Sequence, residues 1–244
     1  MSDPLFDIIR RRAGEIYRDM EKPSFYLERE REIEWSRELI GRSEEVLFAE
    51  SLIRERGGVL GHGYRHADLV AVEAAAIVFS ERGYDDRSRH IAENVLIAGY
   101  LHDLRRYEKE HPQKAALEVG EIYLSRLSPR DLGIITFAIR NHEAFREHEH
   151  VEDMDYMLCA DALYDADKFR WGPDNFLNTL WDMAESLNLS LERIMKGYEK
   201  GIEGIKRIRS TFRTVTGKAY GPGFIDAGLK IGEGIYDLCR KELL

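Results

Sequence analysis

The side chains best suited to chemistry in this chain are an adjacent histidine and aspartate, His102 and Asp103. They directly follow the apolar segment 94–101, whose composition predicts a helix that is buried on most of its surface. Charged and imidazole side chains rarely enter a core without a partner, because losing water costs free energy. An imidazole and a carboxylate delivered to one interior point are suited to holding a divalent metal ion.

Two further segments carry residues of the same kinds. His66 lies near the start of a predicted helix at about 64–82, where the apolar residues after it recur at spacings of four and three and so share its face. Several aspartates lie at 161–167, within a predicted helix at about 154–170. Helical bundles build metal sites from side chains on facing helices. Two imidazoles and two carboxylates suit Mn, Fe, Ni, Co or Zn better than calcium or a metal that prefers thiolates.

The three aspartates of this helix, Asp161, Asp165 and Asp167, cannot all face one ion. A helix rotates by about 100° per residue, so Asp161 and Asp167 point about 120° apart and Asp165 points almost opposite to Asp167. The acids that do not reach the metal would form hydrogen bonds on the helix surface or support a ligand. Rotation alone leaves open which aspartate completes the site.

The order of these residues, His66, then His102-Asp103, then an aspartate, resembles the HD-domain metal-dependent phosphohydrolase superfamily. Segments 65–70 and 101–104 resemble the family's first two motifs, and the resemblance covers about residues 60–175. It implies that Asp167, in the sequence Ala-Asp-Lys-Phe, is the fourth ligand, although phenylalanine stands where the family usually has leucine. Asp161, which also follows an alanine in an apolar stretch, is the alternative.

The resemblance also implies an activity, the hydrolysis of a small phosphate ester such as a nucleotide. The metal would polarise a phosphoryl oxygen and activate a water, and Asp103 would orient that water. Lys168, Arg105 and Arg106 flank the predicted ligands and could neutralise the phosphate. Two other functions stay open. One is a di-iron oxygenase, a chemistry that some HD-type proteins have, and the other is a non-catalytic module whose terminal helices bind a partner.

Two more histidines, His111 and His142, stand where some HD proteins carry ligands for a second metal. The doubled histidine and the Gly-Tyr-Pro signature of the two-metal cyclic-dinucleotide branch are missing, which favours one metal. His142 would then contact the phosphate or move a proton. It ends a predicted helix, whose carbonyl groups should raise its pKa and favour the imidazolium. In the two-metal alternative it would be neutral, with His111 as its companion. His62 lies between glycines and is not expected to pair rigidly with His66.

The elements that must position these residues are all helical. Apolar residues recur at helical spacing in nearly every segment, and no stretch alternates as a strand would. We therefore predict an all-α fold, a single HD-type helical bundle domain over residues 1–244 with its metal-binding core at about 60–175 and extra N- and C-terminal helices. Beyond the helices given above, we expect helical segments at 5–20, 24–56, 111–127, 129–143, 175–188, 191–212 and 224–243 and loops at 57–63 and 214–223.

Composition limits the partners. The net charge of −9 argues against binding a nucleic-acid polymer, but a metal can supply the local positive charge for a small phosphorylated substrate. Cys159 and Cys239 fit no zinc or redox spacing, so we expect buried free thiols and a reducing cytoplasm. The chain shows no secretory signal and no apolar run of membrane-spanning length, so we expect a cytoplasmic protein without a membrane partner.

Overall fold

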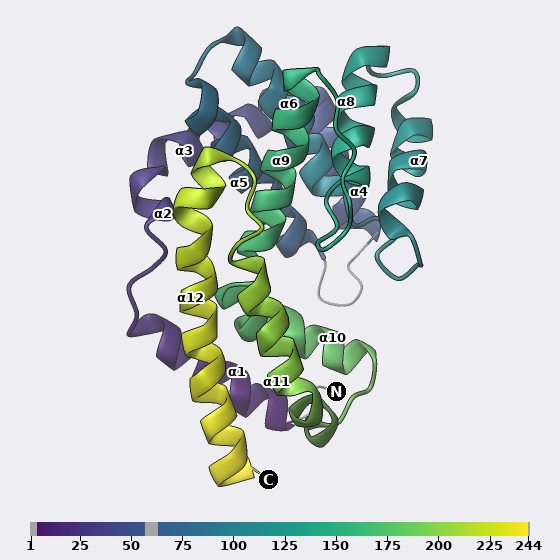
Figure 1. The fold of residues 1–244 in the computed structure, drawn as a ribbon. Helices are drawn as coiled ribbons and strands as arrows, with labels where there is room; N and C mark the ends of the chain where they lie inside the picture. Colours follow the sequence, from purple (N-terminus) through teal and green to yellow (C-terminus); the bar gives the residue numbers. More distant parts are fainter. Residues whose placement is uncertain (1–3, 57–62, 244) are drawn as a thin grey trace.

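The computed structural model describes residues 4–56 and 63–243, and every regular element in these ranges is helical (Figure 1). The prediction of an all-helical fold is confirmed, while the single HD-type domain stays a prediction. The elements are α1 (Pro4–Arg18), α2 (Phe25–Glu28), α3 (Glu30–Ile40), α4 (Glu44–Arg56), α5 (Tyr64–Arg82), α6 (Asp86–Leu101), α7 (His111–Tyr123), α8 (Pro129–Arg140), α9 (Met154–Phe169), η1 (Asn175–Thr179), α10 (Leu180–Ser186), α11 (Leu191–Ile208), α12 (Val215–Leu238) and η2 (Cys239–Leu243).

Helices α5, α6 and α9 form the centre of the molecule, and each packs against the other two. Their sequences explain this position, because the apolar runs 70–79 of α5 and 94–101 of α6 are buried at every residue. Gly99 allows α6 to approach α5 closely, since a Cβ atom there would collide with the backbone of Ala71. This contact brings the end of α6, and with it His102, beside the start of α5, which carries His66.

The predicted starts of α7 and α8 are confirmed. His111 and Pro112 open α7, where the missing N–H of proline costs no hydrogen bond. Ser128 caps α8, and its hydroxyl accepts a hydrogen bond from the backbone N–H of Asp131 at 3.1 Å. Helix α8 packs on α6 and α9, so its C-terminal end, after which His142 follows, points toward the centre.

The helices near the two termini form a second region of the molecule. In Figure 1, α1, α10, α11 and the C-terminal end of α12 lie below the central helices α5, α6 and α9. Helix α12 packs on α1, α9 and α11 and so connects the two regions. Buried apolar side chains from Phe6 to Cys239 belong to one contiguous cluster. Cys159 and Cys239 are buried free thiols, as predicted, and none of the described helices is long and apolar enough to span a membrane.

One predicted helical stretch is divided, and one predicted loop is wrong. Residues 24–56 form three helices, because α3 packs on α5 while α4 packs on α6, and the chain turns at Gly41 to pass from one to the other. Residues 215–223 are helical and belong to α12, although glycines and Pro222 suggested a loop. Gly217 and Gly221 stand where a Cβ atom would collide with the neighbouring side chains, so the glycines serve close packing and not a turn. The predicted loop at 57–63 and His62 fall outside the described residues except for Gly63.

Candidate metal centre

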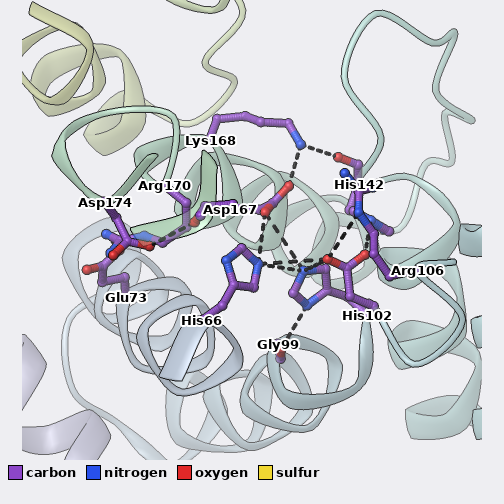
Figure 2. A network of polar contacts seen from close by, with 12 residues as sticks. His66, Glu73, Gly99, His102, Arg106, His142, Asp167, Lys168, Arg170 and Asp174 are labelled. Carbon is purple, nitrogen blue, oxygen red and sulfur yellow. Dashed lines mark hydrogen bonds and ion pairs between the residues drawn. The ribbon is translucent and has the colours of Figure 1, made fainter. Parts of the chain in front are cut away.

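Four side chains predicted to bind a metal meet at the centre of the molecule (Figure 2). His66 comes from the first turn of α5, His102 and Asp103 directly follow α6, and Asp167 lies in the last turn of α9. All four are buried, with exposed fractions between 0% for His102 and 9% for Asp103. The structure therefore brings the four residues together, as the spacing suggested.

The distances between their donor atoms suit a shared ion. His66 Nε2 lies 3.3 Å from His102 Nε2, 3.4 Å from Asp167 Oδ1 and 3.8 Å from Asp103 Oδ2. His102 Nε2 lies 3.3 Å from Asp103 Oδ2 and 3.8 Å from Asp167 Oδ1. Two ligands about 2.0–2.2 Å from one ion lie about 2.8–3.6 Å apart at angles between 90° and tetrahedral. Three of the five distances fall in this range and two exceed it by about 0.2 Å, so the residues present fit a divalent transition metal.

A hydrogen bond orients the imidazole of His102 for this role. His102 Nδ1 donates to the carbonyl oxygen of Gly99 at 2.8 Å, which in the neutral ring leaves the Nε2 lone pair facing the cluster. Burial lowers the pKa of His102, but the carboxylate of Asp103 beside it outweighs burial and raises the pKa overall. Burial alone would raise the pKa of the Asp103 and Asp167 carboxyls. His102 beside Asp103 and Lys168 beside Asp167 outweigh burial and hold the pKa of each carboxyl well below its ordinary value.

A second group of donors shares Asp103. Its Oδ1 lies 3.4 Å from His111 Nε2 and 3.5 Å from His142 Nε2, while its Oδ2 faces His66 and His102. His111 and His142 are buried. The carboxylate of Asp103 therefore lies between two sets of imidazoles, each of which could hold an ion.

Arg106 contacts two members of this second group of donors, His111 and Asp103. Its Nη1 donates a hydrogen bond to His111 Nε2 at 3.0 Å, and its Nε lies 4.0 Å from Asp103 Oδ2. The guanidinium thus supplies a positive charge close to where a second ion would lie and uses the lone pair that such an ion would need. The sequence placed Arg106 beside the ligands but not in contact with His111, a contact that requires the chain to turn between α6 and α7.

The predicted charge of His142 is wrong. Its Nδ1 donates to the carbonyl of Ile139 at 2.6 Å, as its position at the end of α8 suggested, but burial lowers the pKa of His142 below its ordinary value. Near neutral pH the ring is neutral, with its Nε2 lone pair toward Asp103. This form cannot donate a hydrogen bond to a phosphate through Nε2, and it suits a ligand or a proton acceptor instead.

The other aspartates of α9 lie outside the cluster. Asp161 lies 3.6 Å from Nη1 of Arg213. Asp165 is fully buried and accepts hydrogen bonds from the backbone N–H groups of Arg213 and Thr214, each at 2.8 Å, and from the Thr214 hydroxyl at 2.7 Å. Burial raises the pKa of Asp165 to about 7 despite these donors. Asp165 therefore anchors the start of α12.

Lys168 is buried against the cluster and is already engaged there. Its ammonium donates to the carbonyl of His142 at 2.9 Å and forms an ion pair with Asp167 Oδ2. Since the ion pair uses the second carboxylate oxygen, Asp167 Oδ1 is left to face His66 and His102. The ion pair with Lys168 therefore orients the carboxylate of Asp167.

A cavity of about 400 Å³ reaches the cluster at His66. It is lined mostly by polar side chains of α5, η1 and α10. Its carboxylates are paired, since Asp174 bonds Arg65 and the carboxylates of α10 bond Arg10. The site therefore has access for a small ligand on one side.

A second buried pair, which the sequence reasoning missed, lies on the far side of His66 and Asp167 from His142 (Figure 2). Glu73 forms an ion pair with Arg170 and accepts a hydrogen bond from the Tyr26 hydroxyl at 2.7 Å. The signal was a charged residue inside the apolar run of α5, where an unpaired carboxylate would be costly.

Comparison with known proteins adds no relationship: the chain matches no protein-family model, no curated protein and no solved structure. The resemblance to HD-domain phosphohydrolases therefore depends on the residues described above.

Proposed function

We propose that the protein is a metal-dependent hydrolase of small phosphate esters, nucleotides among them. The observation that carries the proposal is the convergence of His66, His102, Asp103 and Asp167 from three helices, with donor atoms 3.3–3.8 Å apart. The order of these residues resembles HD-domain phosphohydrolases, and the cavity at His66 supports a reaction centre over a purely structural ion.

Each residue of the centre has a role in this proposal. A divalent transition metal held by the four donors supplies Lewis acidity toward the phosphoryl group and the attacking water. Asp103 would hold the ion through Oδ2, and its Oδ1 would orient the water. Lys168 positions Asp167, and Arg106 supplies positive charge for the phosphate. His142, neutral and with a free Nε2 lone pair, accepts a proton.

Metal analysis tests the centre directly. Purified protein loaded in turn with Mn, Fe, Ni, Co and Zn should retain about one ion per chain, and His102→Ala and Asp103→Ala should lose it. His150→Ala is the matched control, because His150 is exposed and lies outside the cluster. Full metal retention in both cluster variants would refute the site.

Activity is tested with 4-nitrophenyl phosphate and a panel of nucleotides under each metal. We expect turnover that His102→Ala abolishes and His150→Ala preserves. A loaded protein that binds metal but hydrolyses none of these esters would favour the non-catalytic module.

A two-metal centre is the second candidate, because Asp103 Oδ1, His111 and His142 form a separate donor group. Arg106 competes for its His111 lone pair. If this group binds an ion, the parent should hold up to two ions per chain at saturating metal, Arg106→Ala should bind the second ion more tightly, and His142→Ala should lose only the second ion. If it binds none, both variants should keep about one ion while His142→Ala loses turnover. Oxygen uptake by iron-loaded protein separates the di-iron oxygenase from both hydrolases.

A further inference from the structure

A cavity of about 430 Å³ lies where the terminal helices meet the central ones. Its walls come from α1 and the turn after it, from α2, α5 and α12, and from the chain between the end of α9 and η1. Among the described residues none of the metal-centre donors lines it. Arg65 and Asp174 line both this cavity and the one that reaches His66, so the two cavities are neighbours.

Arg170 lines this cavity and is only 6% exposed. Its Nη2 donates to the Tyr26 hydroxyl at 3.1 Å and pairs with Glu73. Its Nε has no hydrogen-bond partner, and no hydrogen bond between described residues uses its Nη1. A buried guanidinium normally has its donors satisfied. Because Nε has almost no exposed surface, Nη1 is the donor that remains for an acceptor in the cavity.

The charges around the cavity favour an anion. Lys22 lies at its edge, is exposed and forms no ion pair with the described residues. Arg65 makes one ion pair, to Asp174 at 2.8 Å, and Asp174 also accepts a hydrogen bond from Asn178 at 2.9 Å. Together with Arg170 and its partner Glu73, three cations face two carboxylates. The excess positive charge contrasts with the net charge of −9 of the whole chain.

The aromatic surface that the remaining wall exposes belongs to the half-buried Tyr17 and Tyr26, since Phe169 and Phe224 are almost fully buried. Phe169 and Phe224 stack at 4.2 Å between ring centroids, and Tyr26 meets Phe224 edge-on at 5.4 Å. Tyr17 adds a hydroxyl that forms no hydrogen bond with the described residues. A volume of about 430 Å³ lies in the range of small-molecule sites, which combine apolar walls with a few polar groups.

We infer that this cavity is a second ligand site, separate from the metal centre, that binds a small organic anion with a flat aromatic body. The anionic group meets Lys22, Arg65 and Arg170, and the ring lies against Tyr17 and Tyr26. The inference also gives the terminal helices a role, since α1, α2 and α12 complete a cavity that the central helices line on one side only. It does not depend on the proposed hydrolase activity.

Calorimetric titration of metal-free protein with naphthalene-1-sulfonate tests the site. A sulfonate is a weak metal ligand, and removing the metal keeps the two sites apart. We expect saturable binding of about one molecule per chain, and binding of the uncharged 2-naphthol that is about tenfold weaker or less. The His102→Ala variant should bind the sulfonate as the parent does.

Two substitutions locate the binding. Lys22→Glu, an exposed change, should weaken binding about fivefold or more because it reverses the charge at the edge. Leu177→Trp should weaken it about tenfold or more, because Leu177 lines the cavity and the indole would fill it. Lys196→Glu on α11 makes the same charge reversal away from the cavity and should change affinity less than about twofold.

Three results would overturn the inference: no saturable binding, equal weakening by Lys196→Glu and Lys22→Glu, or loss of binding in His102→Ala. Thermal unfolding of each variant checks its fold, and if Leu177→Trp fails to fold, Lys22→Glu decides. Absence of binding here leaves the metal and activity assays untouched, so the two proposals fail separately.

Discussion

Replacing Asp165 by alanine should destabilise the protein strongly without removing metal. Its carboxylate is fully buried and holds the N-terminal end of α12 through two backbone N–H groups and the Thr214 hydroxyl. Alanine offers no acceptor to any of them. Because the hydroxyl can rotate, the lasting cost comes from the amides of Arg213 and Thr214.

The magnitude follows from these two donors. A buried donor left without a partner costs about 1–3 kcal/mol, so two amides cost about 4 kcal/mol in free energy of unfolding. For a chain of this length each kcal/mol lowers Tm by about 2–4 °C, which predicts a decrease of about 8–16 °C. This loss is a large fraction of the roughly 5–15 kcal/mol of a typical domain.

The assay compares three aspartates of the same helix by urea unfolding and by metal content. Asp165→Ala should lose stability and keep the metal, whereas Asp167→Ala should lose the metal. Asp161→Ala removes only a partly exposed ion pair at 3.6 Å, so it should cost less than about 1 kcal/mol and keep the metal.

The reasoning fails if Asp165→Ala releases metal while Asp167→Ala retains it, because the two residues would then have exchanged roles. It also fails if Asp165→Ala and Asp161→Ala unfold at the same urea concentration, since Asp165 would then not anchor α12.

Three further predictions concern the fold. Gly228→Ala should lower the free energy of unfolding by about 2 kcal/mol, because its Cβ would lie 2.6 Å from a backbone carbon of another segment. Gly223→Ala in the same helix meets no atom within 4 Å and should raise it by about 0.5–1 kcal/mol, and urea unfolding of both variants checks this. Burial would raise the pKa of Asp131, but the Ser128 hydroxyl helps to hold it below 3.8. As the pH falls, the unfolded chain therefore takes up the proton before the folded chain does. The stability that the Asp131 carboxylate contributes is present above about pH 4 and is lost as the pH falls further. In acid titrations Asp131→Asn should therefore lose less stability than the parent. Burial raises the pKa of the Cys159 thiol and shields it from reagents. A thiol reagent at pH 8 should therefore modify Cys159 only as fast as the surrounding helices open. Equal rates in native and urea-unfolded protein would contradict this.

Local features were predictable because their physics is local. Ser128 caps α8 and His111-Pro112 opens α7, since a capping hydroxyl and a proline act on the turn that follows them. The apolar spacing after His66 placed its side chain on the buried face of α5 for a similar reason.

The errors arose where distant segments decide. Glycines and Pro222 disfavour a helix on intrinsic propensity, yet α12 includes them because its close contacts with other elements require residues without a Cβ. His142 shows the same limit for charge. The helix end favours its imidazolium locally, but burial by surrounding helices lowers its pKa, and burial cannot be obtained from neighbours in sequence.

The sequence by itself determined the helical architecture and the kinds of donor atom, because hydrophobic period and residue type are properties of the chain. It could not decide which aspartate of α9 faces the histidines. That choice depends on how α9 is rotated against α5, α8 and α12, and Asp167 reaches His66 while Asp165 reaches Thr214 only after these helices pack. The contact of Arg106 with His111 is likewise tertiary. Packing energy over whole helix faces sets such rotations, and no single local preference is strong enough to do so.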